Sequence, residues 1–146
     1  MIAHTIQLAL APVFVLVAIG NILNLLSTRM GRVVDRSRLL IERHAETQGA
    51  DHDKVVRQIR TLDRRISLIG SAIFTLVVSA LTIGMVVALL FLEELLDLDL
   101  QKIAATAFIF AIALLMWALT LFVRETRVAS ASLRIAEDFL EWDRKL

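Results

Sequence analysis

A stripe of amide and hydroxyl side chains interrupts the apolar start of this chain. Gln7, Asn21 and Thr28 are separated by multiples of seven residues, and Asn24 follows Asn21 by three. In a helix these spacings place all four on one side. Because an amide in hydrocarbon needs a hydrogen-bond partner or water, the stripe has two interpretations. It either joins helices together or lines a pore or cavity.

A second stripe carries hydroxyl groups at intervals of four residues, at Ser71, Thr75 and Ser79. Such hydroxyls can bond to a carbonyl one turn earlier in their own helix, so they are tolerated in membranes. A row of small residues lies beside them, at Ala80, Gly84 and Ala88. Small residues allow close helix contact, so we favour packing over transport for this region.

Residues for other chemistry are missing from the sequence. The chain of 146 residues has no cysteine, and it contains no motif for zinc-dependent, serine or phosphate-transfer catalysis. We therefore expect a protein that is not an enzyme and that has no cofactor and no metal site. The net charge of +1 argues against a nucleic-acid partner.

The elements that position the polar stripes are three long runs without any Asp, Glu, Lys or Arg. They cover residues 2–28, 66–92 and 103–123 and are 27, 27 and 21 residues long. About 20 apolar residues in a helix cross the hydrocarbon core of a bilayer. The sequence thus predicts an all-α integral membrane protein whose transmembrane helices lie within residues 1–28, 66–92 and 103–123, in contact with lipid.

Charge predicts the orientation of these helices. Residues 29–65 contain ten Lys or Arg against six Asp or Glu, whereas the loop 93–102 has four acids and one lysine. Basic loops favour the cytoplasmic side. We expect residues 29–65 and the C-terminal segment 124–146 to be cytoplasmic, and the N-terminus and the acidic loop to lie outside.

Residues 29–65 have apolar positions three and four apart on both sides of a break near Gly49. This pattern predicts an antiparallel helical hairpin that is continuous with the first two transmembrane helices. Gly49 would take a left-handed conformation, and Asp51 would cap the second arm. An arm lying on the membrane surface is the alternative. Residues 124–146 are also amphipathic and predict a cytoplasmic helix.

Asp35 lies three residues from both Arg32 and Arg38 within the first arm. Either arginine can meet it along a helix. If the arm packs against Arg64 or Arg65, Asp35 would set the register of the hairpin. We favour this structural role over anion binding by the arginines.

Several segments resemble a bacterial family of small three-span membrane proteins, number twenty-seven twenty-one among the domains of unknown function. The resemblance rests on the segment from Gln7 to Phe14, on Asn24 and on the step from Thr28 to Arg29. It rests further on the segment Arg32 to Arg38, its most specific part, and on the segment Arg64 to Ile69. It covers most of the chain and implies a bacterial inner (cytoplasmic) membrane location, but no activity.

Two kinds of function remain open. The first is a homo-oligomeric scaffold or regulatory subunit that binds a cytoplasmic protein through its hairpin. The second is a homo-oligomeric ion channel whose pore is lined by one of the two polar stripes, which would require a closed ring of copies.

Overall fold

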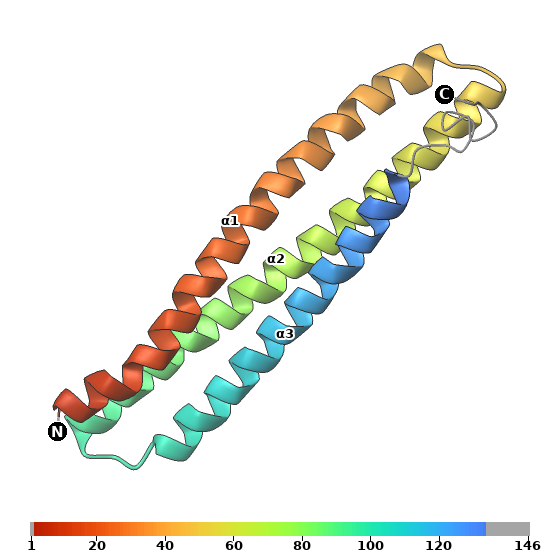
Figure 1. The fold of residues 1–146 in the computed structure, drawn as a ribbon. Coiled ribbons are helices and arrows are strands. Elements are labelled where there is room, and N and C mark those ends of the chain that lie inside the picture. The colour runs from red at the N-terminus through yellow and green to blue at the C-terminus, as the bar shows by residue number, and fades with distance from the viewer. Residues whose placement is uncertain (1, 134–146) are drawn as a thin grey trace, which may run out of the picture.

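Three long helices make up the computed structural model, which describes residues 2–133 (Figure 1). They are α1 (Ile2–Glu46), α2 (Ala50–Leu96) and α3 (Gln101–Ser132). All three are long and apolar enough to cross a membrane, so the all-α prediction is confirmed. At 1.5 Å per residue, the 45 residues of α1 and the 47 of α2 extend for about 70 Å, more than twice the ~30 Å hydrocarbon core. Each of these helices therefore continues well beyond its apolar run.

Two short turns connect the helices. Gly49 precedes α2 with a φ of 70°, a left-handed conformation that glycine adopts without steric cost. The expectation that Asp51 caps α2 is wrong, because Gly49 holds the cap position and Asp51 lies inside the first turn. Its carboxylate instead lies 3.6 Å from the Lys54 ammonium. The second turn begins at Asp97, which has a φ of 54°, and is shorter than the loop 93–102 that the charges suggested.

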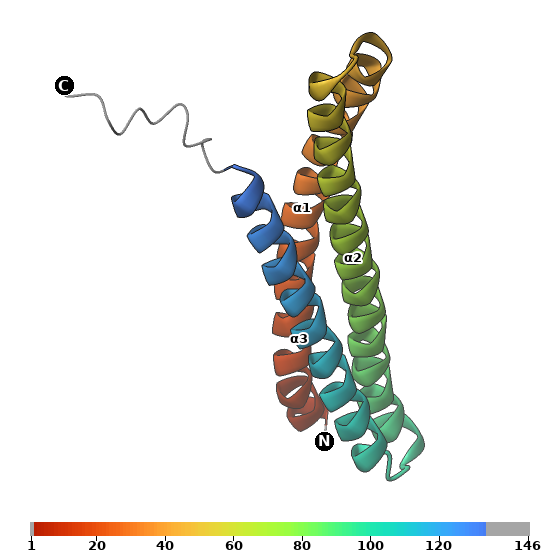
Figure 2. The ribbon, with the colours of Figure 1, turned by 90° about the vertical axis from the view of Figure 1, so that its right-hand side faces the viewer.

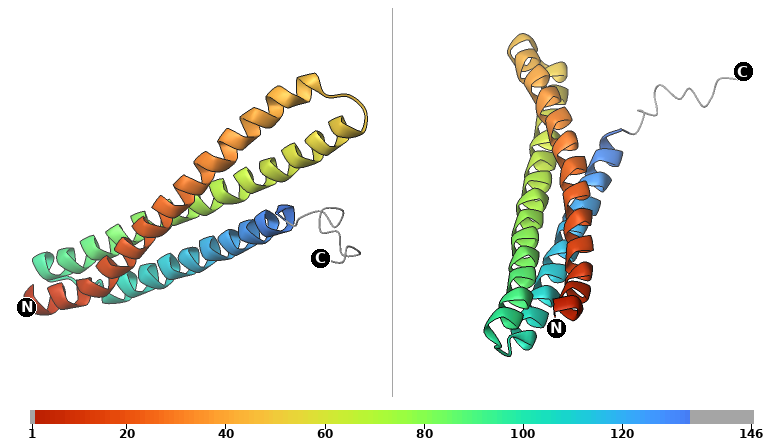
Figure 3. Two further views of the ribbon diagram at one scale, coloured as in Figure 1. Left: turned by 45° about the horizontal axis from the view of Figure 1, so that its top comes forward. Right: turned by 90° about the vertical axis from the view of Figure 1, so that its left-hand side faces the viewer.

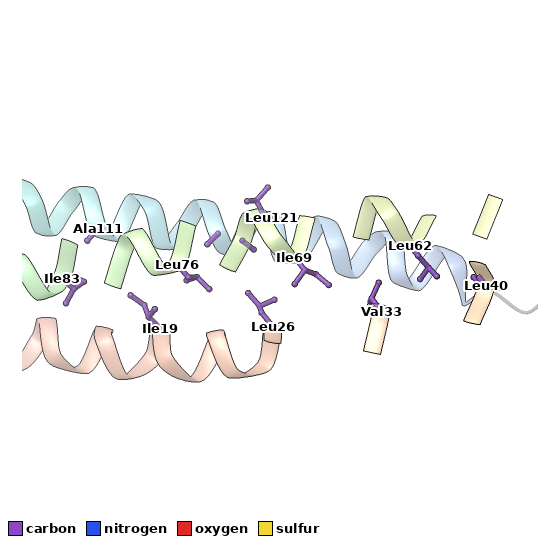
Figure 4. Packing of buried hydrophobic residues seen from close by; sticks show 12 residues of the cluster. Ile19, Leu26, Val33, Leu40, Leu62, Ile69, Leu76, Ile83, Ala111 and Leu121 are labelled. Carbon is purple, nitrogen blue, oxygen red and sulfur yellow. The ribbon is translucent and has the colours of Figure 1, made fainter. Parts of the chain in front are cut away.

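Buried residues recur every seven positions along each helix. Seven residues are about two helical turns, so side chains at this spacing form one continuous seam. Figure 4 shows the α1 and α2 columns of this seam pointing toward each other. The buried columns are Thr5, Pro12, Ile19, Leu26, Val33 and Leu40 in α1, Leu62, Ile69, Leu76 and Ile83 in α2, and Ala104, Ala111, Ala118 and Glu125 in α3.

Helix α2 is the central element of the fold. It packs against α1 on one side and against α3 on the other, whereas α1 and α3 have few direct contacts. Figures 2 and 3 show α3 running beside α2 over the part of the molecule opposite the α1–α2 turn. Within residues 2–133, α1 and α2 continue beyond the end of α3 as an antiparallel pair, which forms the outer part of the hairpin of residues 29–65.

The segment 124–146 does not begin as a separate helix. Helix α3 continues without a break from its apolar run to Ser132. The rest of this predicted amphipathic helix, residues 134–146, lies outside the described part of the chain.

Candidate functional site

A buried acid lies where α3 leaves its apolar run. Glu125 is fully buried and follows Ala118 by seven residues, so it occupies the same column as the small alanines of α3. A carboxylate in this position faces α1 and α2 rather than water. Burying an ionised carboxylate is costly unless it is paired with a charge and hydrogen-bonded.

Both carboxylate oxygens of Glu125 receive a charged donor, each from a different helix. The Nη2 of Arg29 in α1 donates to Oε2 at 2.7 Å, and the Nε of Arg65 in α2 donates to Oε1 at 2.9 Å. The two arginine side chains are mostly buried, with exposed fractions of 28% and 17%. We call these three residues the Glu125 cluster. It carries two positive charges and one negative charge.

Further contacts hold Arg29 in place. Its guanidinium lies over the ring of Phe122 in α3, 5.2 Å from the ring centre, a favourable cation–π arrangement. The Nε of Arg29 is buried and has no hydrogen-bond partner within residues 2–133. The cluster links α1 directly to α3, two helices that otherwise touch little.

The Glu125 cluster was not predicted from the sequence, although Arg29 and Arg65 are the first and last residues of the basic segment 29–65. Glu125 lies in the C-terminal segment 124–146, for which the sequence predicted an amphipathic cytoplasmic helix and no buried charge. The sequence feature that could have indicated the cluster is the row of alanines in α3. Ala104, Ala111 and Ala118 are seven residues apart, and the next position at this spacing is Glu125. An acid in a column of small residues indicates a buried ion pair, since a small residue at this spacing marks a helix contact.

The amide stripe of α1 lies on the side of the helix away from its neighbours. Gln7, Asn21, Asn24 and Thr28 are all exposed. Asn21 follows the buried Ile19 by two residues, and Asn24 precedes the buried Leu26 by two, which turns each of them about 150° or more away from the seam. The stripe therefore does not join α1 to α2 or α3.

The hydroxyl stripe of α2 divides between two environments. Ser79 is fully buried, and its hydroxyl donates to the carbonyl of Ala111 in α3 at 2.8 Å. Ser71 is exposed, and Thr75 donates to the Ser71 carbonyl of its own helix at 2.8 Å. Of these three residues, only Ser79 therefore links α2 to another described helix. In the neighbouring small-residue row, Gly84 and Ala88 are exposed in the single chain.

The charges of the first hairpin arm do not set its register. Arg32, Asp35 and Arg38 are all exposed, and none of them forms an ion pair in the described part of the chain. The expected contact of Asp35 with Arg64 or Arg65 is absent there, because Arg65 turns toward Glu125 instead. The register of α1 against α2 follows from the apolar seam and the Glu125 cluster.

The opposite end of the bundle has its own polar link between helices. The hydroxyl of Thr5, in the buried column of α1, donates to Oε2 of Glu94 near the end of α2 at 3.2 Å. Polar contacts therefore join helices at both ends of the apolar region: α1 to α2 at this end, and α1 and α2 to α3 at the Glu125 cluster. Within residues 2–133 no group of three or more His, Asp or Glu is arranged to hold a metal ion.

We expect Glu125→Gln to lower the free energy of unfolding by about 3 kcal/mol, because it leaves two mostly buried arginines without a counter-charge. The measurement is unfolding in mixed detergent micelles, followed by circular dichroism. Asp51→Asn is the control, since it removes an exposed pair at 3.6 Å and should change stability by less than about 0.5 kcal/mol. Equal stability of the two variants would contradict the structural role of the cluster.

Comparison with known proteins bears on the family alone. Residues 9–135 match the family described as Protein of unknown function (DUF2721). Searches of curated proteins and of solved structures found no match. The match includes most of α1, all of α2 and α3, and the whole Glu125 cluster. With three helices able to span a bilayer and this match over most of its length, the chain is a membrane protein that belongs to the DUF2721 family.

Proposed function

We propose that this protein is a non-enzymatic, homo-oligomeric scaffold or regulatory subunit of the bacterial inner membrane. Copies would associate through the exposed amides of α1. The hairpin formed by residues 29–65 would present a helical surface to a cytoplasmic protein.

The position of Asn21 carries this proposal. It is exposed in the single chain and lies eight residues before Arg29, about 12 Å along the helix axis. A short asparagine side chain at this depth does not reach the water at the membrane surface. Its amide has no hydrogen-bond partner within residues 2–133. A second copy supplies one, because an amide is both donor and acceptor.

Two glycines on the same side of α1 favour close approach of a second copy. Gly20 and Gly31 are exposed, and a Cβ atom added at either would meet nothing within 4 Å. Packing inside the single chain therefore does not require glycine at these positions. Glycine at a contact between membrane helices lets their backbones approach closely.

The hairpin offers a surface for a partner. Leu39 and Ile41 lie beyond the apolar run of α1 and are 62% and 59% exposed. Large apolar side chains outside the bilayer are costly to leave in water, and they are typical of interaction surfaces. The cytoplasmic placement of this surface follows from its excess of Lys and Arg.

Asn21→Leu and Asn24→Leu should each raise the dissociation constant for self-association about threefold to thirtyfold, through loss of an interhelical hydrogen bond. Energy transfer between two differently labelled copies in lipid bilayers measures this constant. Thr120→Leu is the matched control, because Thr120 is exposed on α3 and its hydroxyl already bonds to the Met116 carbonyl. If the asparagine variants associate like the natural protein, the amides do not form the interface.

The same exposed amides also favour the second candidate, an ion channel in which a ring of copies turns Asn21 and Asn24 toward a central path. In that case liposomes containing the purified protein should conduct ions, and Asn21→Leu should change the conductance at least severalfold by removing a polar group from the pore. The control is liposomes with Thr120→Leu. A stable oligomer without conductance at any voltage would leave the scaffold as the function.

Labelling of introduced cysteines tests the orientation, since the natural chain has none. Gln48→Cys lies in the hairpin turn and Asp99→Cys in the acidic turn, and both positions are exposed. A membrane-impermeant maleimide added to intact cells should label Asp99→Cys but not Gln48→Cys, and inside-out vesicles should give the reverse. The opposite pattern would place the hairpin outside and overturn the cytoplasmic assignment.

A further inference from the structure

The outward face of α1 continues beyond the membrane without a change of spacing. In the apolar run it contains Gln7, Phe14, Asn21 and Thr28 in one column, and Leu10, Val17, Asn24 and Gly31 in a second column. The next members of the two columns are Asp35 and Arg38. All ten residues are exposed, although they alternate at intervals of three and four like a helix-packing seam. α1 thus has two seams on opposite sides, and only one of them is filled within the chain.

The two charges complement each other across such a seam. Asp35 and Arg38 are exposed and form no ion pair within residues 2–133. Copies in one membrane share the same topology, so their α1 helices run parallel. In a parallel pair in register, Arg38 of one copy lies three residues, about 4.5 Å along the helix axis, beyond the level of Asp35 of the other, a distance that the long arginine side chain can span.

We propose that two copies of this chain meet along the outward face of α1 and that Asp35 of each copy pairs with Arg38 of the other. This inference rests on the proposed self-association and adds its partner, its orientation and its charged contact. Amides provide the contact inside the hydrocarbon, and the ion pairs extend it into the hairpin. The occupant of the face is a second copy, because its own residues present the opposite charge three residues further along the same face.

The test is complementation between two oppositely charged variants. Asp35→Arg gives a chain with only positive charge at the two positions, and Arg38→Asp gives one with only negative charge. For each variant alone, the dissociation constant for self-association should be at least about threefold higher than for the natural protein, because like charges then face each other. An equimolar mixture should regain the natural affinity as a mixed pair, and the gain should shrink in about 1 M salt. A pair formed within one helix cannot produce this rescue between chains.

The control applies the same exchange to Asp53→Arg and Arg57→Asp, which are exposed on α2 and off this face. These variants should associate like the natural protein, alone and mixed, and circular dichroism should show unchanged helix content for all four. If Asp35→Arg and Arg38→Asp associate normally, or if mixing restores nothing, the ion pairing is overturned while self-association through the amides stands. A monomeric natural protein would overturn the proposed function and this inference with it.

Discussion

The seven-residue spacing of buried side chains is the constraint on which this structure depends. An α-helix makes nearly two turns in seven residues, so a residue at this interval returns to the same side over the whole length of a helix. The column from Thr5 to Leu40 therefore keeps α1 against α2 both in the apolar run and in the hairpin. The same spacing also decides what faces outward. Because Asn21 and Asn24 lie two residues from members of the buried column, they cannot face α2 while the seam is intact.

Glu125 is a charged member of one of these columns. Its burial is offset by Arg29 and Arg65, which approach from the two other helices at the end of their apolar runs. A helix held only by apolar contacts can shift along its neighbour more readily than a helix whose carboxylate must meet two guanidinium groups. The cluster therefore fixes the longitudinal position of α3, which has few contacts with α1 apart from this link. Thr5 and Glu94 provide a weaker polar link between α1 and α2 at the other end.

The distribution of polar groups separates structure from interaction. Polar groups that serve the single chain are buried and bonded, as Ser79 is to the Ala111 carbonyl. The amides of α1 are instead exposed on one side, next to glycines that the chain does not need for its own packing. In water an exposed amide is hydrogen-bonded by the solvent, but in hydrocarbon it is stabilised by a hydrogen bond to a neighbouring helix. This contrast is the physical basis for placing a second copy there.

The sequence by itself determined the three membrane-spanning helices and the membrane environment. Long charge-free runs have few alternatives to a transmembrane helix, because lipid offers the backbone no other hydrogen-bond partners. It also determined the break at Gly49 and the continuity of the hairpin arms with the spans. It left the side on which each polar stripe faces undecided, because periodicity shows that residues share a face and not what that face meets. Only the tertiary structure decided that Ser79 faces inward, that the α1 amides face outward and that Glu125, rather than Asp35, meets Arg65, since these outcomes depend on which helices pack together and at what level.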